Sequence, residues 1–221
     1  MSNETVLPPD VAEEMSTPRY PLHPLLAQRR SLRAFSSRRI DSETLGSLLE
    51  AARWAPSSMN EQPWSFIVAT QQNEEGFRCL LGCLLEFNVR WAKNAPVLLL
   101  SIARLTFASN GEINRHAFHD VGQAVAHLTL QANASGLAIC QMAGFDIQKV
   151  REDYSIPEDH EPVTVAAIGY PGDPTTLSER LRHKQLAPQK RNRLEDFVFE
   201  GKWRQPAQGV VTATNEYAQE K

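Results

Sequence analysis

Residues 29–64 read RRSLRAFSSRRIDSETLGSLLEAARWAPSSMNEQPW, with a polar cluster at each end of the stretch. The first cluster, Arg29 to Arg33, offers three guanidinium groups and a hydroxyl, which suit a phosphate monoester and an electron-rich carbonyl edge. The second, Ala55 to Trp64, carries small hydroxyls and amides between prolines that stiffen the backbone. A helix is expected between them, because Asp41 is a good N-cap and Pro56 is a stop signal. The stretch therefore predicts two ligand-binding clusters separated by one helix.

The composition indicates one ordinary globular domain. The 221 residues suffice for a buried core, and the 42% hydrophobic and 22% charged contents are unremarkable for such a domain. A formal net charge of -3 argues against a nucleic-acid partner, which calls for a basic excess. The longest apolar run, 95–103, is too short to span a bilayer, so no membrane partner is expected. The N-terminus lacks a secretory pattern and the three cysteines suit reduced thiols, which favours cytoplasmic residence.

Helix and strand patterns alternate along the chain. We expect a loose arm at 1–20, one domain at 21–203 and a tail at 204–221. Segment 104–115 has the polar composition of a loop or lid. The remaining patterns predict helices at 24–28, 41–55, 74–88, 115–135 and 146–154, and strands at 64–69, 97–102, 137–142, 162–168 and 196–199.

The arginine cluster alone is weak evidence for a site, because arginines that follow a helix are usually solvated. Its weight rises with four further segments that follow it in order. They are Asn88 before Asn94-Ala95-Pro96, Asp120 to Ala124, Met142 to Asp146, and Arg191 to Leu194. With these segments, the chain resembles the flavin-dependent nitroreductase family from His23 to about Trp203.

The resemblance implies an FMN site and assigns residues to the pyrimidine edge and N5 of the flavin. It places Arg33 and Asn88 at the pyrimidine edge of the flavin, where a fixed cation favours the reduced form. It brings the backbone of Ala143 and Gly144 close to N5. Ala143 departs from one branch of the family, which carries a glutamate there, so only a main-chain role is expected at this position.

Two further groups of residues follow from the same resemblance. The phosphate or ribityl chain is assigned to Arg29, Arg30 and Ser31, joined by Arg191 and Arg193. The residues that match those reaching the flavin from the opposite subunit are Pro56, Ser57, Ser58 and Asn60. The site would therefore require a homodimer.

The fold implied by the resemblance is α+β, with a central, mainly antiparallel sheet flanked by helices in an intertwined homodimer. The last strand, around Val198, would join the partner's sheet, and the helix containing residues 120–134 would form much of the interface. NAD(P)H would give hydride to flavin N5, and a small-molecule acceptor such as a nitroaromatic or quinone would then take it in a ping-pong cycle. The chain has no glycine-rich dinucleotide loop, so the nicotinamide is expected as a co-substrate. No side-chain acid, base or metal ligand is assigned.

Other interpretations of the same residues remain open. In isolation, Ser57 to Asn60 would be a capping turn. The tryptophans at 54, 64 and 91 are interpreted as core and the three cysteines as buried free thiols, while His116 and His119 lack a third metal ligand. The alternative function is a non-catalytic flavin-binding or redox-sensing protein on the same scaffold.

Overall fold

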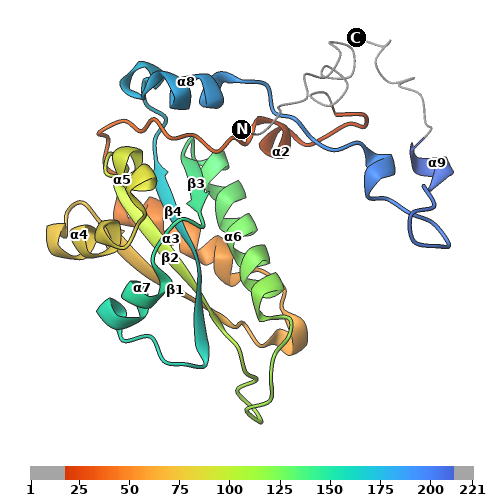
Figure 1. Ribbon diagram of the computed structural model, residues 1–221, viewed down its shortest axis with the longest axis horizontal. Helices are drawn as coiled ribbons and strands as arrows, with labels where there is room; N and C mark the ends of the chain where they lie inside the picture. Colours follow the sequence, from red (N-terminus) through yellow and green to blue (C-terminus); the bar gives the residue numbers. More distant parts are fainter. Residues whose placement is uncertain (1–17, 212–221) are drawn as a thin grey trace. The chain divides into compact units, whose positions relative to one another are not determined.

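The computed structural model describes residues 18–211 (Figure 1). These residues fall into two compact units, one of residues 28–185 and one made of the described residues on either side of it. Most of the expected arm at 1–20 and the end of the expected tail at 204–221 lie outside the described residues. Within 18–211, no helix is both long and apolar enough to cross a bilayer.

The larger unit is built on a four-stranded sheet, in which the order of strands is β1-β2-β4-β3 and every pair is antiparallel. The strands are β1 (Trp64–Thr70), β2 (Val97–Arg104), β3 (Ala138–Met142) and β4 (His160–Gly169). Both the expected α+β class and the antiparallel sheet are confirmed. The four expected strands between residues 64 and 168 are present with small shifts at their ends.

The helices begin and end close to the sequence signals that predict them. Asp41 caps the second helix by accepting a hydrogen bond from the Thr44 backbone N–H at 2.7 Å, and Asp146 does the same for Lys149 at 3.0 Å. The α-helices are α2 (Pro24–Gln28), α3 (Ser42–Arg53), α4 (Glu74–Gly82), α5 (Glu86–Ala92), α6 (Ala117–Ala134), α7 (Ile147–Tyr154), α8 (Glu179–Leu186) and α9 (Gln208–Val211). Short 3-10 turns occupy η1 (Ser58–Asn60), η2 (Pro174–Thr176) and η3 (Leu194–Asp196).

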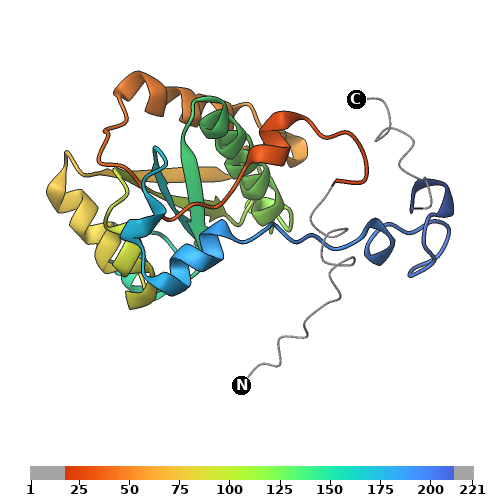
Figure 2. The same ribbon diagram turned by 90° about the horizontal axis from the view of Figure 1, so that it is seen from above.

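Helices cover both faces of the sheet, because alternate side chains of a strand point to opposite sides. On β2, Val97 and Leu99 pack in a cluster with α3 and α6, whereas Leu98 and Leu100 pack in a second cluster with α4, α5 and α7. Figures 1 and 2 show α3 and α6 lying along the strands, apart from α4 and α5. This double coverage explains why β2 reads as a continuous apolar run.

The single helix expected at 74–88 is wrong, because the structure has two helices there with a break at residues 83–85. The Leu85 backbone N–H donates to the Gly144 carbonyl at 3.0 Å, and the Asp146 N–H donates to the Cys83 carbonyl at 2.8 Å. An isolated antiparallel bridge joins Leu84 to Phe145. These bonds to a distant segment replace the helical pattern, although the apolar spacing runs through the break.

The strand expected at 196–199 pairs with no strand of the described chain. The structure has the 3-10 turn η3 there, and Asp196 accepts a hydrogen bond from the Arg193 backbone N–H at 3.1 Å. The only pairing described in this segment is an isolated bridge between Phe199 and Pro206. A strand of this segment in a partner's sheet remains a prediction.

The aromatic and sulfur side chains are only partly in the core. Trp91 is 2% exposed and Trp64 is half-buried, but Trp54 is 72% exposed, so its assignment to the core is wrong. The Trp54 indole N–H donates to Glu50 at 3.0 Å on the surface of α3. Cys83 and Cys140 are buried free thiols as expected, whereas Cys79 is only partly buried. No cluster of metal-ligating side chains occurs among residues 18–211.

Candidate functional site

A buried glutamine fixes the backbone of the arginine cluster. The side-chain Oε1 of Gln185, near the end of α8, accepts the backbone N–H groups of Arg33 at 2.6 Å and Ala34 at 3.1 Å. The Arg30 guanidinium donates to the Gln185 carbonyl at 2.9 Å, and the Arg29 guanidinium donates to the Ser31 hydroxyl at 3.3 Å. Gln185 is only 6% exposed. The sequence gives no sign of this role, because α8 has the polar composition of a solvated segment.

Arg33 is a half-buried cation held over an aromatic ring. Its guanidinium carbon lies 5.6 Å from the centroid of the Trp91 ring in α5. Within residues 18–211 it forms no ion pair with a carboxylate. The charge of Arg33, with those of Lys184 and Arg29, opposes the effect of burial, which raises the pKa of the Cys140 thiol on β3. Arg33, Lys184 and Arg29 therefore place positive charge near β3.

The backbone at Ala143 and Gly144 has unused donors. Neither backbone N–H finds an acceptor among residues 18–211, although the segment follows directly after β3. The Gly144 carbonyl accepts both the Leu85 N–H at 3.0 Å and the Asn88 side-chain amide at 3.0 Å. A Cβ on Gly144 would lie 2.6 Å from the Phe87 ring and 2.7 Å from the Asn88 amide nitrogen. Any side chain at this position would require Phe87 and Asn88 of α5 to shift.

Helix α5 contacts both Arg33 and the segment at Gly144. Asn88 and Trp91 are three residues apart, so they lie on the same face of the helix. Asn88 donates a hydrogen bond to the Gly144 carbonyl, and the Trp91 ring lies against the guanidinium of Arg33. The structure thus brings Arg33, Asn88 and Gly144 together around one face of α5. This arrangement places a cation and unpaired backbone donors around the same face of α5, with the Asn88 amide bonded to the Gly144 carbonyl.

The second polar cluster forms a strained turn after α3. Its backbone φ angles are 54° at Met59, 55° at Asn60 and 50° at Gln62, in the left-handed region that non-glycine residues rarely adopt. Such conformations cost on the order of 1 kcal/mol each and concentrate at functional sites. Inside the turn, the Gln62 N–H donates to the Ser57 hydroxyl at 3.0 Å. A simple helix-capping turn at residues 57–60 would not explain the positive φ angles at Met59, Asn60 and Gln62.

Helix α6 holds the turn from the other side. The Asp120 carboxylate, 1% exposed, accepts the Ser58 backbone N–H at 3.0 Å, and the Gln123 amide donates to the Pro56 carbonyl at 3.3 Å. His119 also lies 3.1 Å from the Asp120 carboxylate, and its side chain is otherwise largely exposed. Asp120 belongs to a segment that the sequence singles out, but its role as the anchor of the turn emerges only from the structure.

No hydrogen bond or ion pair joins the turn at Pro56 to Asn60 to the arginine cluster within residues 18–211. Helix α3 stands between the two clusters in the chain, and its twelve residues span about 18 Å. The Pro56, Met59 and Asn60 side chains are exposed. The structure therefore does not assemble both clusters around one site within a single subunit.

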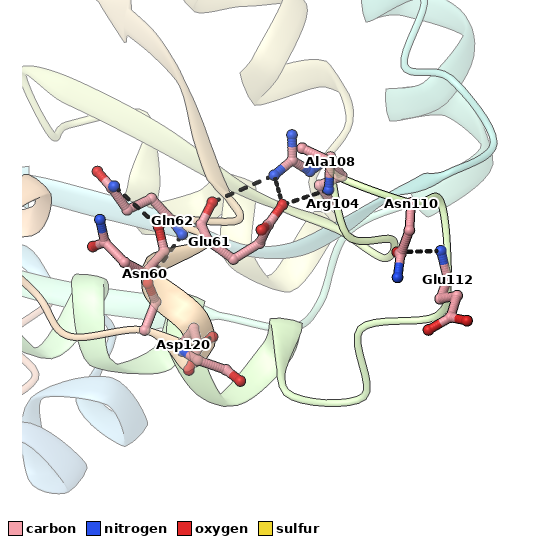
Figure 3. Close-up of polar contacts among 10 residues, drawn as sticks. Asn60, Glu61, Gln62, Arg104, Ala108, Asn110, Glu112 and Asp120 are labelled. Atoms are coloured by element: carbon pink, nitrogen blue, oxygen red, sulfur yellow. Dashed lines mark hydrogen bonds and ion pairs between the residues drawn. The ribbon is translucent and has the colours of Figure 1, made fainter.

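Segment 104–115 is an ordered hairpin rather than an open loop. The Phe107 N–H donates to the Glu112 carbonyl at 2.8 Å and the Asn114 N–H to the Leu105 carbonyl at 2.7 Å. Figure 3 shows the Glu61 side chain, from the strained turn, pointing toward Arg104 and Ala108 at the base of this hairpin.

Arg191 and Arg193 lie in the other compact unit. Arg191 donates to the Lys190 carbonyl and the Gln189 amide oxygen, each at 2.8 Å. Arg193 lies 3.5 Å from Glu195. The role that these two arginines would share with the first arginine cluster remains a prediction.

Known proteins resemble this chain over most of its length. The family model described as "Nitroreductase family" matches residues 26–170. A putative NADH dehydrogenase/NAD(P)H nitroreductase of Methanothermobacter thermautotrophicus is 29% identical over 66% of this chain and 74% of its own. Iodotyrosine deiodinase 1 of Sus scrofa is 26% identical over 70% of this chain and 63% of its own. A crystal structure described as an oxidoreductase containing FMN is 34% identical, with a TM-score of 0.80 over 85% of this chain and 95% of that chain.

Proposed function

Because this chain belongs to the nitroreductase family, we propose that it is an FMN-dependent oxidoreductase that uses NAD(P)H to reduce a small oxidised acceptor such as a nitroaromatic or quinone. The observation that carries the proposal is the grouping of Arg33, Asn88 and Gly144 around one face of α5. The similarity to a structure described as containing FMN supports the choice of cofactor.

The residues present fit a flavin mononucleotide. Arg33 is a half-buried cation without a carboxylate partner among the described residues, and the N–H groups of Ala143 and Gly144 are donors without acceptors there. A ligand with an electron-rich edge and a ring nitrogen would satisfy both. Arg29, Arg30 and Ser31 would hold the phosphate or ribityl chain, joined by Arg191 and Arg193, because guanidinium groups suit phosphate oxygens.

The bound flavin would supply the hydride-transferring centre between NAD(P)H and the acceptor in a ping-pong cycle. The protein's own residues would supply position and charge. Arg33 would stabilise negative charge on the cofactor's pyrimidine edge, since a fixed cation is worth more in a half-buried site than in water. Asn88 would orient the 143–144 backbone through the Gly144 carbonyl. No side-chain acid or base is assigned.

We propose a homodimer as the active form. Pro56, Ser57, Ser58 and Asn60 would contact the flavin of the partner subunit, which agrees with their separation from the arginine cluster. Helix α6 also supports a shared interface, because Gly122 and Ala126 are exposed on it and Phe118 is 50% exposed. Met59, 86% exposed, adds to the apolar surface beside α6. Cytoplasmic residence belongs to the proposal as well, since the three cysteines are free.

The test is steady-state oxidation of NADH or NADPH by the purified protein with a nitroaromatic or a quinone as acceptor. We expect turnover with at least one nicotinamide and parallel lines in double-reciprocal plots, as a ping-pong cycle requires. A yellow protein whose flavin neither nicotinamide reduces would instead establish the alternative, a non-catalytic flavin-binding or redox-sensing protein.

A further inference from the structure

One side chain of the strained turn after α3, that of Glu61, contacts a segment outside the turn. Residues 59, 60 and 62 are in the left-handed region, and Glu61 lies between them. This geometry directs the Glu61 side chain away from the turn, toward the end of β2 (Figure 3). The Glu61 side chain is only 11% exposed. A charged group this buried contributes to the structure chiefly through its partners.

Glu61 has two partners at the root of the hairpin formed by residues 105–115. Its Oε1 accepts the Ala108 backbone N–H at 2.6 Å and forms an ion pair with the Arg104 guanidinium. The same guanidinium nitrogen, Nη2, also donates to the Glu61 carbonyl at 3.3 Å. The buried Nε of Arg104 has no acceptor among residues 18–211, so the carboxylate of Glu61 is a major partner of this cation. One carboxylate oxygen therefore joins the turn to the hairpin.

The two arms of the hairpin are bonded to each other. They are joined by an isolated bridge between Thr106 and Ile113, and the Gly111 N–H donates to the Phe107 carbonyl at 2.9 Å. Ile113 is 81% exposed. Contacts at the root therefore set the position of the exposed part.

We propose that Glu61 is a positioning residue that holds the 105–115 hairpin on the flavin-contacting turn and so determines which acceptors reach the flavin. This inference rests on the proposed function, which places Ser57, Ser58 and Asn60 against the cofactor. Glu61 does not touch the cofactor itself. It acts through the turn on one side and through Arg104 and Ala108 on the other, so that the position of the hairpin relative to the turn depends on this carboxylate.

The first arm of the test measures the link itself by hydrogen–deuterium exchange of the full-length protein. In Glu61→Ala, the amides of the hairpin, Ala108 included, exchange about tenfold faster, because a charge-assisted acceptor is lost. Glu61→Gln keeps a neutral acceptor and gives a smaller increase. Glu112→Gln is the matched control, since it removes the same charge from the exposed tip region of the same hairpin and leaves exchange at the parent rate. An unchanged rate in Glu61→Ala overturns the inference.

The second arm measures acceptor selection at saturating FMN, so that cofactor occupancy does not enter. We expect the ratio of kcat/KM for a large nitroaromatic to that for a small quinone to change about fivefold or more in Glu61→Ala and to stay at the parent value in Glu112→Gln. Faster exchange with an unchanged ratio makes Glu61 a merely structural contact and overturns the inference, while the proposed function stands. A parent protein that binds no flavin refutes the proposed function, and acceptor selection by Glu61 falls with it.

Discussion

At the scale of single residues, a side chain belongs to the candidate site because of the residues that it contacts, and its residue type alone does not decide this. Arg33 and Arg38 illustrate this difference. Both guanidinium groups stack on an aromatic ring, Arg33 on Trp91 at 5.6 Å and Arg38 on Tyr170 at 3.8 Å. Only Arg33 is tied to the site, through the shared helix face of Trp91 and Asn88 and through the buried Gln185.

Replacing Arg33 with alanine is expected to lower the reduction potential of bound flavin and to slow its reduction about tenfold, because the reduced pyrimidine edge loses a nearby cation. Stopped-flow absorbance with NADH or NADPH measures the rate, and dye equilibration measures the potential. Arg38→Ala removes an equivalent stacked arginine and should match the parent. A reduction rate in Arg33→Ala equal to that of the parent would show that the assigned role is wrong.

Gln185 is the residue that sequence reasoning overlooked, and its substitution has a specific expected cost. Gln185→Ala leaves the backbone N–H groups of Arg33 and Ala34 without their acceptor, so the free energy of unfolding should fall by about 2 kcal/mol. FMN affinity should fall as well, since the backbone of the arginine cluster is no longer fixed. Urea denaturation and fluorescence titration with FMN check both effects. Gln148→Ala on the exposed face of α7 is the control, and equal stability of the two variants would contradict the assignment.

At the scale of helices and strands, local patterns predict most of the structure but fail where a distant segment intervenes. The caps at Asp41 and Asp146 act within a few residues, and the helices that they begin are present. The break between α4 and α5 depends on bonds from Cys83 and Leu85 to residues about 60 positions away. No local pattern contains that information, and the break lies beside Asn88 in the candidate site.

The same reasoning explains which site residues the sequence could predict. The resemblance to the nitroreductase family predicts Arg33, Asn88 and Gly144 as site residues, and the structure brings them together around α5. Gln185 and Glu61 were missed because an amide or carboxylate in a polar segment looks solvated until its distant partner is known. Helix α8 was missed for a related reason, since its polar sequence has no apolar face that would predict a helix.

The contact of α5 with the segment after β3 can be tested at Gly144. Gly144→Ala should place a methyl group 2.7 Å from the buried Asn88 amide nitrogen, break its bond to the Gly144 carbonyl and destabilise the fold by about 1–3 kcal/mol. FMN affinity should fall in parallel. Thermal unfolding and FMN titration measure the two effects. Gly82→Ala, where nothing lies within 4 Å of an added Cβ, should be neutral, and the account fails at this point if the two substitutions behave alike.

At the scale of the whole molecule, the separation of the two polar clusters is the strongest argument that function needs two subunits. Ala126 lies exposed on α6, the helix that anchors the Ser58 turn through Asp120. Ala126→Glu should place a carboxylate in the proposed interface, shift the protein to the monomer and weaken FMN binding at least about tenfold. Light scattering after gel filtration and FMN titration measure both. Gln148→Glu adds the same charge on α7 and should leave a dimer, whereas a monomeric parent with full FMN affinity would refute the shared site.

The visible absorption spectrum of the purified protein, recorded without oxygen before and after addition of NADH or NADPH, is the sharpest test of flavin-dependent activity. We expect the two visible bands of an oxidised protein-bound flavin, bleached by at least one of the two nicotinamides and restored by a nitroaromatic or quinone. A colourless protein that takes up no added FMN would contradict this expectation.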